Sequence, residues 1–248
     1  MYEEHSAFQT PPHSRIIWRY MSFEKFVWLI AQEKLYFARL DQHDDWWEGL
    51  IPKSWNSQNK RYIRFNAYIN CWHMNNSESD SMWKIYGNQN GETVAIKSSV
   101  GHLIESLAKL SNPVYIGKID YAELNMPQSN LYLPVTCKRN EFRHEKELRL
   151  CISSDCSFNP PNLSNLKQEY LSLGVDKSDM ELLKDIYSKW NPKGISIKVN
   201  LSMLLREVIM CPDCRSSLKK SVDYILKRKV PGAKIKYSKY DPCHQKKR

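Results

Sequence analysis

The chain has 248 residues, 42% of them hydrophobic and 26% charged, a composition typical of soluble globular proteins and not of disordered or low-complexity ones. Only 8 residues are glycine, which disfavours a glycine-rich dinucleotide-binding loop, and the longest apolar run, residues 26–31, is far shorter than the roughly 20 residues that a membrane span requires. The 7 cysteines show no disulfide framework and the N-terminus shows no secretory signal, so the sequence predicts a cytoplasmic protein that does not bind a membrane.

The positive charge of the chain is concentrated at its C-terminal end. The net charge is +10, and residues 215–248 contain twelve Lys and Arg residues against two Asp residues, so the preceding residues are neutral overall. Such a region can bind the phosphates of a nucleic acid. It can equally be a solvated helix face that ends in a basic tail, which we expect at residues 241–248.

In chain order, the sequence predicts a flexible or loosely docked N-terminus at residues 1–13, closed by two prolines, and then a single domain over residues 14–240 with a helical insertion at about 155–192. Runs of β-branched and aromatic residues predict strands at residues 16–20, 35–38, 68–73, 93–97, 114–121, 148–153, 195–199, 208–210 and 233–237. Amphipathic spacing predicts helices at residues 22–33, 100–110 and 216–228. Because strands and helices are interspersed without regular alternation, we expect an α+β fold with mixed, largely antiparallel sheets and flanking helices.

The stretch over residues 69–91 joins a strand to a short helix through a polar turn. Alternation in the strand places Tyr68, Asn70 and Trp72 on one face, and Ile69, Cys71 and His73 on the other. Ser77 is the predicted cap of the helix, which carries Met82, Trp83 and Tyr86. Polar side chains beside free N–H groups suit an anion or nucleotide site, although any capped helix has the same features.

Arg19 is predicted at the end of the first strand, between Trp18 and Tyr20. A guanidinium at this position can bind a phosphate or carboxylate through two parallel hydrogen bonds, and the flanking rings can stack on a ligand. The alternative is an edge-strand arginine that pairs with a neighbouring acid.

Two other segments contain residue types that bind metals. Asp44, Asp45 and Glu48 could hold a divalent cation or act in acid–base chemistry, or they could cap a turn that packs on two tryptophans. Cys211 and Cys214 form a single C-x-x-C pair, and zinc needs four ligands. A strand end followed by a proline-initiated helix explains that pair better, so we expect no metal.

The most specific pattern in the chain is K-x3-F-x2-E-x-E-x-R, formed by Lys138, Phe142, Glu145, Glu147 and Arg149. In an extended segment the two glutamates and the arginine point to the same side. Two adjacent carboxylates raise the pKa of one of them and make it a candidate general acid or base, unless the arginine neutralises them. The alternative is a cross-strand ladder of salt bridges.

Taken together, the motifs resemble the bacterial family called domain of unknown function 2971, over about residues 16–238. The matching motifs are W-R-Y, L-Y-F-A-R, D-D-W-W-E-G, C-W-H-x-N-x-S-E-S-x-S-M-W-x-x-Y-G, the Glu-rich pattern above, and V-I-x-C-P. Their order more distantly resembles the ADP-ribosyltransferase fold, in which an Arg or His on the first strand holds NAD and a Glu before a late strand assists the departure of nicotinamide.

That second resemblance implies roles for individual residues. Arg19 would bind the diphosphate or ribose of NAD, and Glu147 would stabilise the transition state, with Glu145 completing the E-x-E arrangement of enzymes that modify arginine. The nicotinamide and ribose pocket would be lined by Tyr20, Tyr36, Phe37, Cys71, Trp72, His73, Ser79, Trp83 and Tyr86. The chain departs from the usual Ser-x-Ser of the middle strand, where it has Cys71, Trp72 and His73.

The resemblance therefore implies an NAD-dependent ADP-ribosyltransferase or NAD glycohydrolase. NAD would be its substrate, a protein or nucleic acid its acceptor, and its role that of a bacterial toxin or phage-defence effector, with a regulator protein as a further expected partner. A rival hypothesis from a different class is a nucleic-acid-binding or metal-dependent nuclease-like defence module that uses the basic C-terminal region. A third is a partner-binding protein without catalytic activity, in which all of these motifs serve packing.

Overall fold

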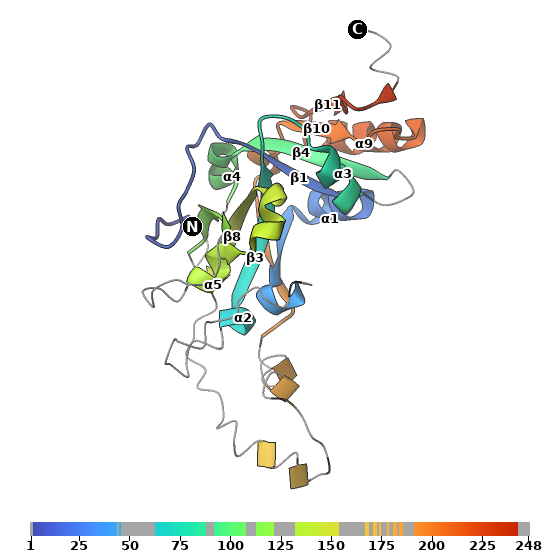
Figure 1. Ribbon diagram of the computed structural model, residues 1–248. Helices are drawn as coiled ribbons and strands as arrows, with labels where there is room; N and C mark the ends of the chain where they lie inside the picture. Colours follow the sequence, from blue (N-terminus) through green and yellow to red (C-terminus); the bar gives the residue numbers. More distant parts are fainter. Residues whose placement is uncertain are drawn as a thin grey trace.

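The computed structural model describes residues 2–43, 45, 63–87, 92–107, 113–121, 132–153 and 191–242, and some positions between 167 and 185. In this part of the chain a nine-stranded sheet organises the fold, and helices flank it (Figure 1). Its strands are β1 (Ile16–Ser22), β2 (Lys34–Arg39), β3 (Ala67–Met74), β4 (Thr93–Ser99), β5 (Tyr115–Lys118), β8 (Glu147–Ser153), β9 (Gly194–Lys198), β10 (Glu207–Met210) and β11 (Lys234–Tyr237).

The sheet is mixed and largely antiparallel. Every pairing in it is antiparallel except that of β10 with β11, and the short strands β6 (Asp120–Tyr121) and β7 (Cys137–Lys138) form a separate parallel pair. The fold is therefore α+β, as the sequence predicts, and most predicted strands agree with the observed ones to within two residues. The predicted strand over 114–121 is instead divided between β5 and β6.

The sheet branches at β3, and this branch positions the functional site. One edge of β3 pairs with β8 over the whole of residues 67–73. The other edge pairs with β1 at His73 and Met74, and with β2 at Tyr68 and Ile69. Between these two pairings, residues 70–72 pair with no strand of the described chain on that edge. β1 continues instead along β4, and β2 continues along β9, so the two halves of the sheet diverge on either side of this free edge.

The helices are mostly short, and their ends follow from local capping. They are α1 (Phe23–Gln32), α2 (Ile63–Asn66), α3 (Asp80–Tyr86), α4 (Val100–Ser106), α5 (Leu133–Thr136), α8 (Leu201–Leu204) and α9 (Ser216–Lys229), with 3-10 turns η1 (Leu40–Gln42) and η3 (Asn140–Glu145). Ser22 caps α1, as predicted, by accepting a hydrogen bond from the backbone of Lys25. The apolar faces of α1 and α9 join the main core, which covers most of the sheet.

The cap of α3 differs from the prediction. The capping residue is Ser79, whose hydroxyl accepts from the backbone N–H of Met82, and not Ser77. Both serines precede a helical pattern at an acceptable distance, so local sequence does not separate them. The predicted helix over 100–110 also ends earlier, because the backbone of Leu107 is extended.

The N-terminal segment packs on the domain, where the sequence predicts a flexible or loosely docked segment. Phe8 is buried in a cluster of rings with Tyr115 and Tyr132, and the backbone N–H of Lys118 donates to the carbonyl of Gln9. The backbone of Phe8 lies so close to Gly117 that any Cβ there would meet it. This contact between distant segments has no local sequence signal.

The predicted insertion at 155–192 lies largely outside the described residues, as do residues 243–248 of the predicted basic tail. Among the described residues, no helix combines the length and apolar character needed to cross a membrane.

Candidate functional site

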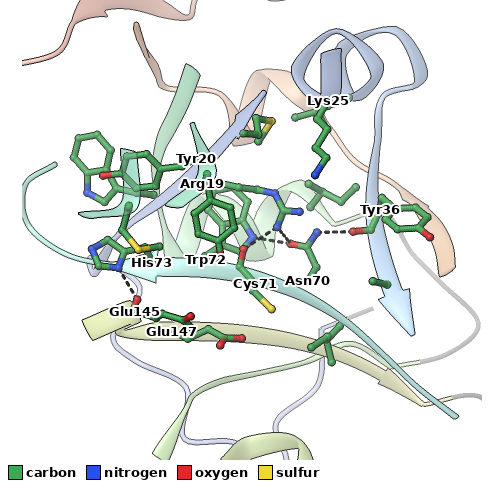
Figure 2. Close-up of a pocket in the computed structure, with 18 of the residues that line it drawn as sticks. Arg19, Tyr20, Lys25, Tyr36, Asn70, Cys71, Trp72, His73, Glu145 and Glu147 are labelled. Carbon is green, nitrogen blue, oxygen red and sulfur yellow. Dashed lines mark hydrogen bonds between the residues drawn. The ribbon is translucent and has the colours of Figure 1, made fainter. Parts of the chain in front are cut away.

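A cavity lies where the two halves of the sheet diverge around the open edge of β3 at residues 70–72. Its volume is about 420 Å³, within the range of roughly 300–1,000 Å³ that is usual for small-ligand sites. Nine of the predicted site residues line it: Arg19, Tyr20, Tyr36, Cys71, Trp72, His73, Tyr86, Glu145 and Glu147. Figure 2 labels all of them except Tyr86 and shows how their side chains converge on the cavity.

The cavity wraps around the free edge of β3 and therefore touches both faces of the strand. Asn70 and Trp72 line it from one face, and Cys71 and His73 line it from the other. Figure 2 shows Arg19 on the Asn70 side of the strand and Glu147 on the opposite side, with the Cys71 thiol pointing toward the glutamate. A ligand that fills the cavity would thus meet a cation at one end and a carboxylate at the other.

Arg19 spans the gap left by the missing strand pairing. Its Nη1 donates to the side-chain oxygen of Asn70 at 2.7 Å and to the carbonyl of Cys71 at 2.8 Å, and the guanidinium lies 5.7 Å from the ring centre of Trp72. Within the part of the chain that the structure describes, no carboxylate pairs with it. Burial lowers the pKa of Arg19 from its ordinary value, because a buried cation loses its hydration. An anionic ligand would restore the missing partner.

Asn70 fixes this arrangement. Its side-chain oxygen accepts from Arg19 and from Nε1 of Trp72, at 2.8 Å, while its amide nitrogen donates to the carbonyl of Tyr36 at 2.8 Å. The amide therefore connects β1, β2 and β3 across the branch point, and only 1% of its surface is exposed. It orients the guanidinium without carrying charge itself.

Two lysines stand beside Arg19 at the mouth of the cavity. Lys25 lies one turn into α1, where the Ser22 cap places it, and Figure 2 shows its side chain pointing into the pocket with that of Arg19. Lys34 opens β2 and also lines the cavity. Trp28 and Tyr36 complete this side with partly exposed rings, 39% and 45% accessible. This end of the cavity is therefore more basic than Arg19 alone would make it.

The opposite end of the cavity is a buried cluster of charges. Arg149 donates to both carboxylate oxygens of Glu147, at 2.7 and 3.1 Å, and Nζ of Lys138 lies 3.6 Å from the same carboxylate. The same lysine donates to Glu145 at 2.7 Å. Glu145 ends η3, and Lys146 follows it with a left-handed backbone, φ 42°. That turn lets consecutive elements present Glu145 and Glu147 to one lysine.

These contacts decide the ionisation of Glu147. Burial opposes ionisation, but the charges of Arg149 and Lys138 outweigh it and lower the pKa of the carboxyl to about 2. The arginine thus neutralises the like-charge effect that would have raised one carboxyl pKa. Glu147 is an anion at neutral pH, so it can stabilise positive charge but cannot act as a general acid. The sequence makes an acid–base role for one of the two glutamates conditional on the arginine, and Arg149 is paired with Glu147.

His73 is a neutral member of the wall. Its Nδ1 lies 2.5 Å from the carbonyl oxygen of Glu145, and because a carbonyl only accepts, Nδ1 carries the proton. Burial lowers the pKa of the imidazole, which leaves it uncharged at neutral pH. The histidine therefore holds η3, and with it Glu145, against the end of β3.

Three predicted pocket residues do not line the cavity. Phe37 is fully buried in the core, because alternation along β2 turns it to the face opposite Tyr36. Trp83 packs edge-to-face on Tyr20 at 4.8 Å between ring centres, and Ser79 donates its backbone N–H to the hydroxyl of Tyr20. Trp83 and Ser79 support the wall from behind.

The residues that the sequence singles out as possible metal ligands, although no metal is expected, are only partly described. Asp45 pairs with Arg139 at 3.0 Å, whereas Asp44 and Glu48 lie outside the described residues. Cys211 and Cys214 form no disulfide with any described cysteine. No group of three His, Cys, Asp or Glu side chains among the described residues is arranged to hold a metal.

Several pocket residues are not among the site residues that the sequence predicts, chiefly Lys25, Trp28, Lys34 and Asn70. Lys25 and Trp28 lie on the exposed side of an ordinary amphipathic helix, where a lysine and a tryptophan have no functional signature. Strand alternation places Asn70 correctly on the face of Trp72. A buried amide in the middle of an apolar strand is itself a signal, since it needs partners that neighbouring apolar residues do not supply.

No protein-family model matches the chain, and no curated protein matches its sequence. A solved structure of DarT from Thermus sp. 2.9 in complex with NAD+ is similar to this chain, with a TM-score of 0.40 and 9% identity, over 93% of this chain and 98% of the DarT chain. At that TM-score the likeness is too distant to assign an activity. The resemblance to domain of unknown function 2971 likewise stays a prediction from the motifs.

Proposed function

We propose that the cavity binds NAD and that the protein cleaves the bond between nicotinamide and ribose, passing ADP-ribose to an acceptor or to water. The observation that carries this proposal is the opposite charge at the two ends of the cavity. A guanidinium without a carboxylate partner among the described residues stands at one end, and the carboxylate of Glu147, whose pKa is lowered to about 2, stands at the other. NAD has the matching polarity, with an anionic diphosphate and a cationic nicotinamide ring.

At the basic end, Arg19 and Lys25 would bind the diphosphate. The Nη1 atom of Arg19 is already committed to Asn70 and Cys71, which leaves Nε and Nη2 to donate to phosphate oxygens. Lys25 adds a flexible second cation. The aromatic rings of Tyr36 and Trp28 give a surface for the adenine base.

At the acidic end, Glu147 would stabilise the transition state. When the bond from the ribose C1′ to the ring nitrogen breaks, its electron pair leaves with nicotinamide and positive charge develops on the ribose. A carboxylate fixed by Arg149 and Lys138 can face this charge without reorganising. The acceptor or water then forms a bond to C1′ and loses its proton to solvent. Glu145, held by Lys138, would position that lysine.

The same chemistry supports a role as a toxin or defence effector, because NAD is needed by every cell. Induced expression of the active protein is then expected to lower cellular NAD and arrest growth. We infer this role from the chemistry of the pocket and from the motif resemblance.

The test is release of nicotinamide from NAD by the purified full-length protein, with cell extract supplied as a source of acceptors. Glu147→Gln is expected to lower the rate about 100-fold or more, the usual loss when a preorganised electrostatic contact to a transition state is removed. Arg19→Ala is expected to raise KM more than it lowers kcat. Glu141→Gln and Arg143→Ala, two exposed changes on η3, are the matched controls. Unchanged nicotinamide release in Glu147→Gln would overturn the proposal.

A further inference from the structure

Lys138 fills the space between the two carboxylates at the acidic end of the cavity. Its Nζ donates to Glu145 at 2.7 Å and lies 3.6 Å from the carboxylate of Glu147. The ammonium also lies 4.6 Å from the ring centre of Phe142, and only 9% of the lysine side chain is exposed. The place that an incoming cation would take beside these carboxylates is therefore held by a residue of the chain itself.

The charges at this end of the cavity already balance. Lys138 and Arg149 contribute two positive charges, and Glu145 and Glu147 contribute two negative ones, so the four side chains sum to zero. Among the described residues that line the cavity, these two glutamates are the only ones with a carboxylate. NAD would add the positive charge of its nicotinamide ring. A further incoming cation would be buried without a carboxylate of its own, and an uncompensated buried charge is strongly unfavourable.

A cationic acceptor needs a carboxylate for two reasons. An ammonium or guanidinium must be held by an opposite charge, and it must lose a proton before its nitrogen can attack the ribose C1′. Both oxygens of Glu147 accept from Arg149, and the lowered pKa of about 2 makes this carboxylate a weak base. Glu145 accepts from Lys138. A cationic acceptor would thus have to displace Lys138, whereas a neutral hydroxyl group already has a lone pair and needs no opposite charge.

We propose that Lys138 is a specificity-determining residue that keeps cationic acceptors out of the cavity, so that ADP-ribose passes to water or to another neutral hydroxyl group. The bond from C1′ to nicotinamide breaks with its electron pair on nicotinamide, the hydroxyl oxygen forms the new bond to C1′, and the hydroxyl proton passes to solvent. This inference rests on the proposed function and names the chemical class of its acceptor. It differs from the arginine acceptor that the resemblance of the E-x-E pattern implies.

The acceptor class is tested with the purified full-length protein, NAD, and either ethylguanidinium or ethanol, a cationic and a neutral acceptor with the same ethyl group. Mass spectrometry measures each product per nicotinamide released, a ratio that does not depend on how fast nicotinamide leaves. We expect wild type to give ADP-ribose and its ethyl glycoside. We expect no ethylguanidinium adduct above the level that free ADP-ribose gives without enzyme, and an adduct above that level would overturn the inference.

Lys138→Met removes the ammonium and leaves the Glu145 carboxylate open to an added cation. The ethylguanidinium adduct per nicotinamide released is expected to rise at least about tenfold, because a buried carboxylate that has lost its partner strongly favours a new one. Lys138→Arg keeps the positive charge and should exclude ethylguanidinium as wild type does. Lys118→Met, at an exposed lysine on β5 that does not line the cavity, is the matched control. Nicotinamide release by Lys138→Met without the rise in adduct would overturn the role of Lys138.

A measurement without NAD tests the same position independently of activity. Ethylammonium chloride is expected to raise the Tm of Lys138→Met above its value in equal sodium chloride, because the added cation replaces the lost ammonium, and to leave wild type unchanged. The absence of that rise counts against the role of Lys138. If Lys138→Met does not fold, the product ratio of wild type decides alone. Absence of nicotinamide release from wild type counts instead against the proposed function.

Discussion

Arg149 donates to both carboxylate oxygens of Glu147, its neighbour two residues earlier on the same strand, through Nε at 2.7 Å and Nη2 at 3.1 Å. The guanidinium is fully buried and also donates to the carbonyl of Val135, so it fixes the carboxylate in one orientation. Two parallel hydrogen bonds between charged groups are among the strongest side-chain contacts, and they also fix the orientation of the carboxylate. The pair gives the cavity a carboxylate that is ionised and immobile before any ligand arrives.

Removing one member of this pair is expected to cost more stability than removing both. Arg149→Met leaves the buried carboxylate without its main partner, and breaking a buried pair in this way costs about 3–5 kcal/mol of unfolding free energy. The double variant Arg149→Met, Glu147→Leu removes both charges and should recover part of that loss. Urea unfolding of wild type, both single variants and the double variant measures the coupling. Strictly additive losses would show that the pair contributes nothing as a unit.

Stability is expected to fall in acid because of Glu147. The folded-state pKa of Glu147 is lowered to about 2 from an ordinary 4.5, so its stabilising contribution is present above the ordinary value and is lost as pH falls toward the folded value. This contribution is about 3 kcal/mol, because each tenfold change in proton affinity corresponds to about 1.36 kcal/mol. Urea unfolding between about pH 6 and pH 3 should show wild type losing much of this free energy, while Glu147→Gln loses less. If the unfolding free energies of the two proteins fall equally with pH, Glu147 is not the source of the acid-dependent loss of stability.

The sequence predicted most of the fold because its strands and helices carry local signals. Residues 16–22 have the β-branched and aromatic composition of a strand, and Ser22 is followed by an amphipathic pattern that specifies α1. The packing of the N-terminus has no such local signal, because it depends on Phe8 meeting rings more than a hundred residues away. Such a contact depends on the closure of the whole sheet and leaves no trace in the residues around Phe8.

The candidate site was predictable in its charges but not in its geometry. Arg19 and Glu147 stood out as charged residues within strand patterns, and both line the cavity. The gap that brings them to one cavity arises because β1 and β2 pair with opposite ends of one edge of β3. Strand pairing of this kind is set by long-range register, which period-two alternation does not encode. Lys34 and Lys198 became neighbours for the same reason.

Gly194→Ala is expected to act on ligand binding through Tyr36. A Cβ at position 194 would overlap the Tyr36 hydroxyl, so the ring must move away from its place at the mouth. We expect the variant to weaken NAD binding as much as Tyr36→Ala does, with little loss of stability because the ring is already partly exposed. Calorimetric titration of both single variants and the double variant gives the measurement. If the losses add in the double variant, Gly194 acts by some route other than Tyr36.

Ser79→Ala is expected to destabilise the protein, whereas Ser77→Ala is expected to leave it nearly unchanged. The hydroxyl of Ser79 accepts from the free N–H of Met82 at the start of α3, and losing such a cap costs about 1 kcal/mol. The hydroxyl of Ser77 makes one long contact of 3.5 Å, to the carbonyl of Glu78. Thermal unfolding of the two variants side by side separates the roles, and equal shifts in Tm would contradict the cap assigned to Ser79.

Ser238→Ala is expected to loosen the cavity wall from the C-terminal end of the chain. Glu78 is buried, and its carboxylate accepts from Nε1 of Trp83 at 3.1 Å, from the backbone of Lys239 at 3.0 Å and from the hydroxyl of Ser238. These bonds tie the segment after β11 to the start of α3, the helix that supplies Met82 and Tyr86 to the cavity. Deleting the Ser238 hydroxyl leaves the buried carboxylate short of one donor, at a cost of about 1–3 kcal/mol.

We expect a lower urea midpoint together with a higher KM for NAD and a nearly unchanged kcat, because α3 shapes the wall but does not contact the groups that react. Ser216→Ala, at the exposed start of α9, is the control, and a loss confined to kcat would show that the segment acts on the chemistry itself.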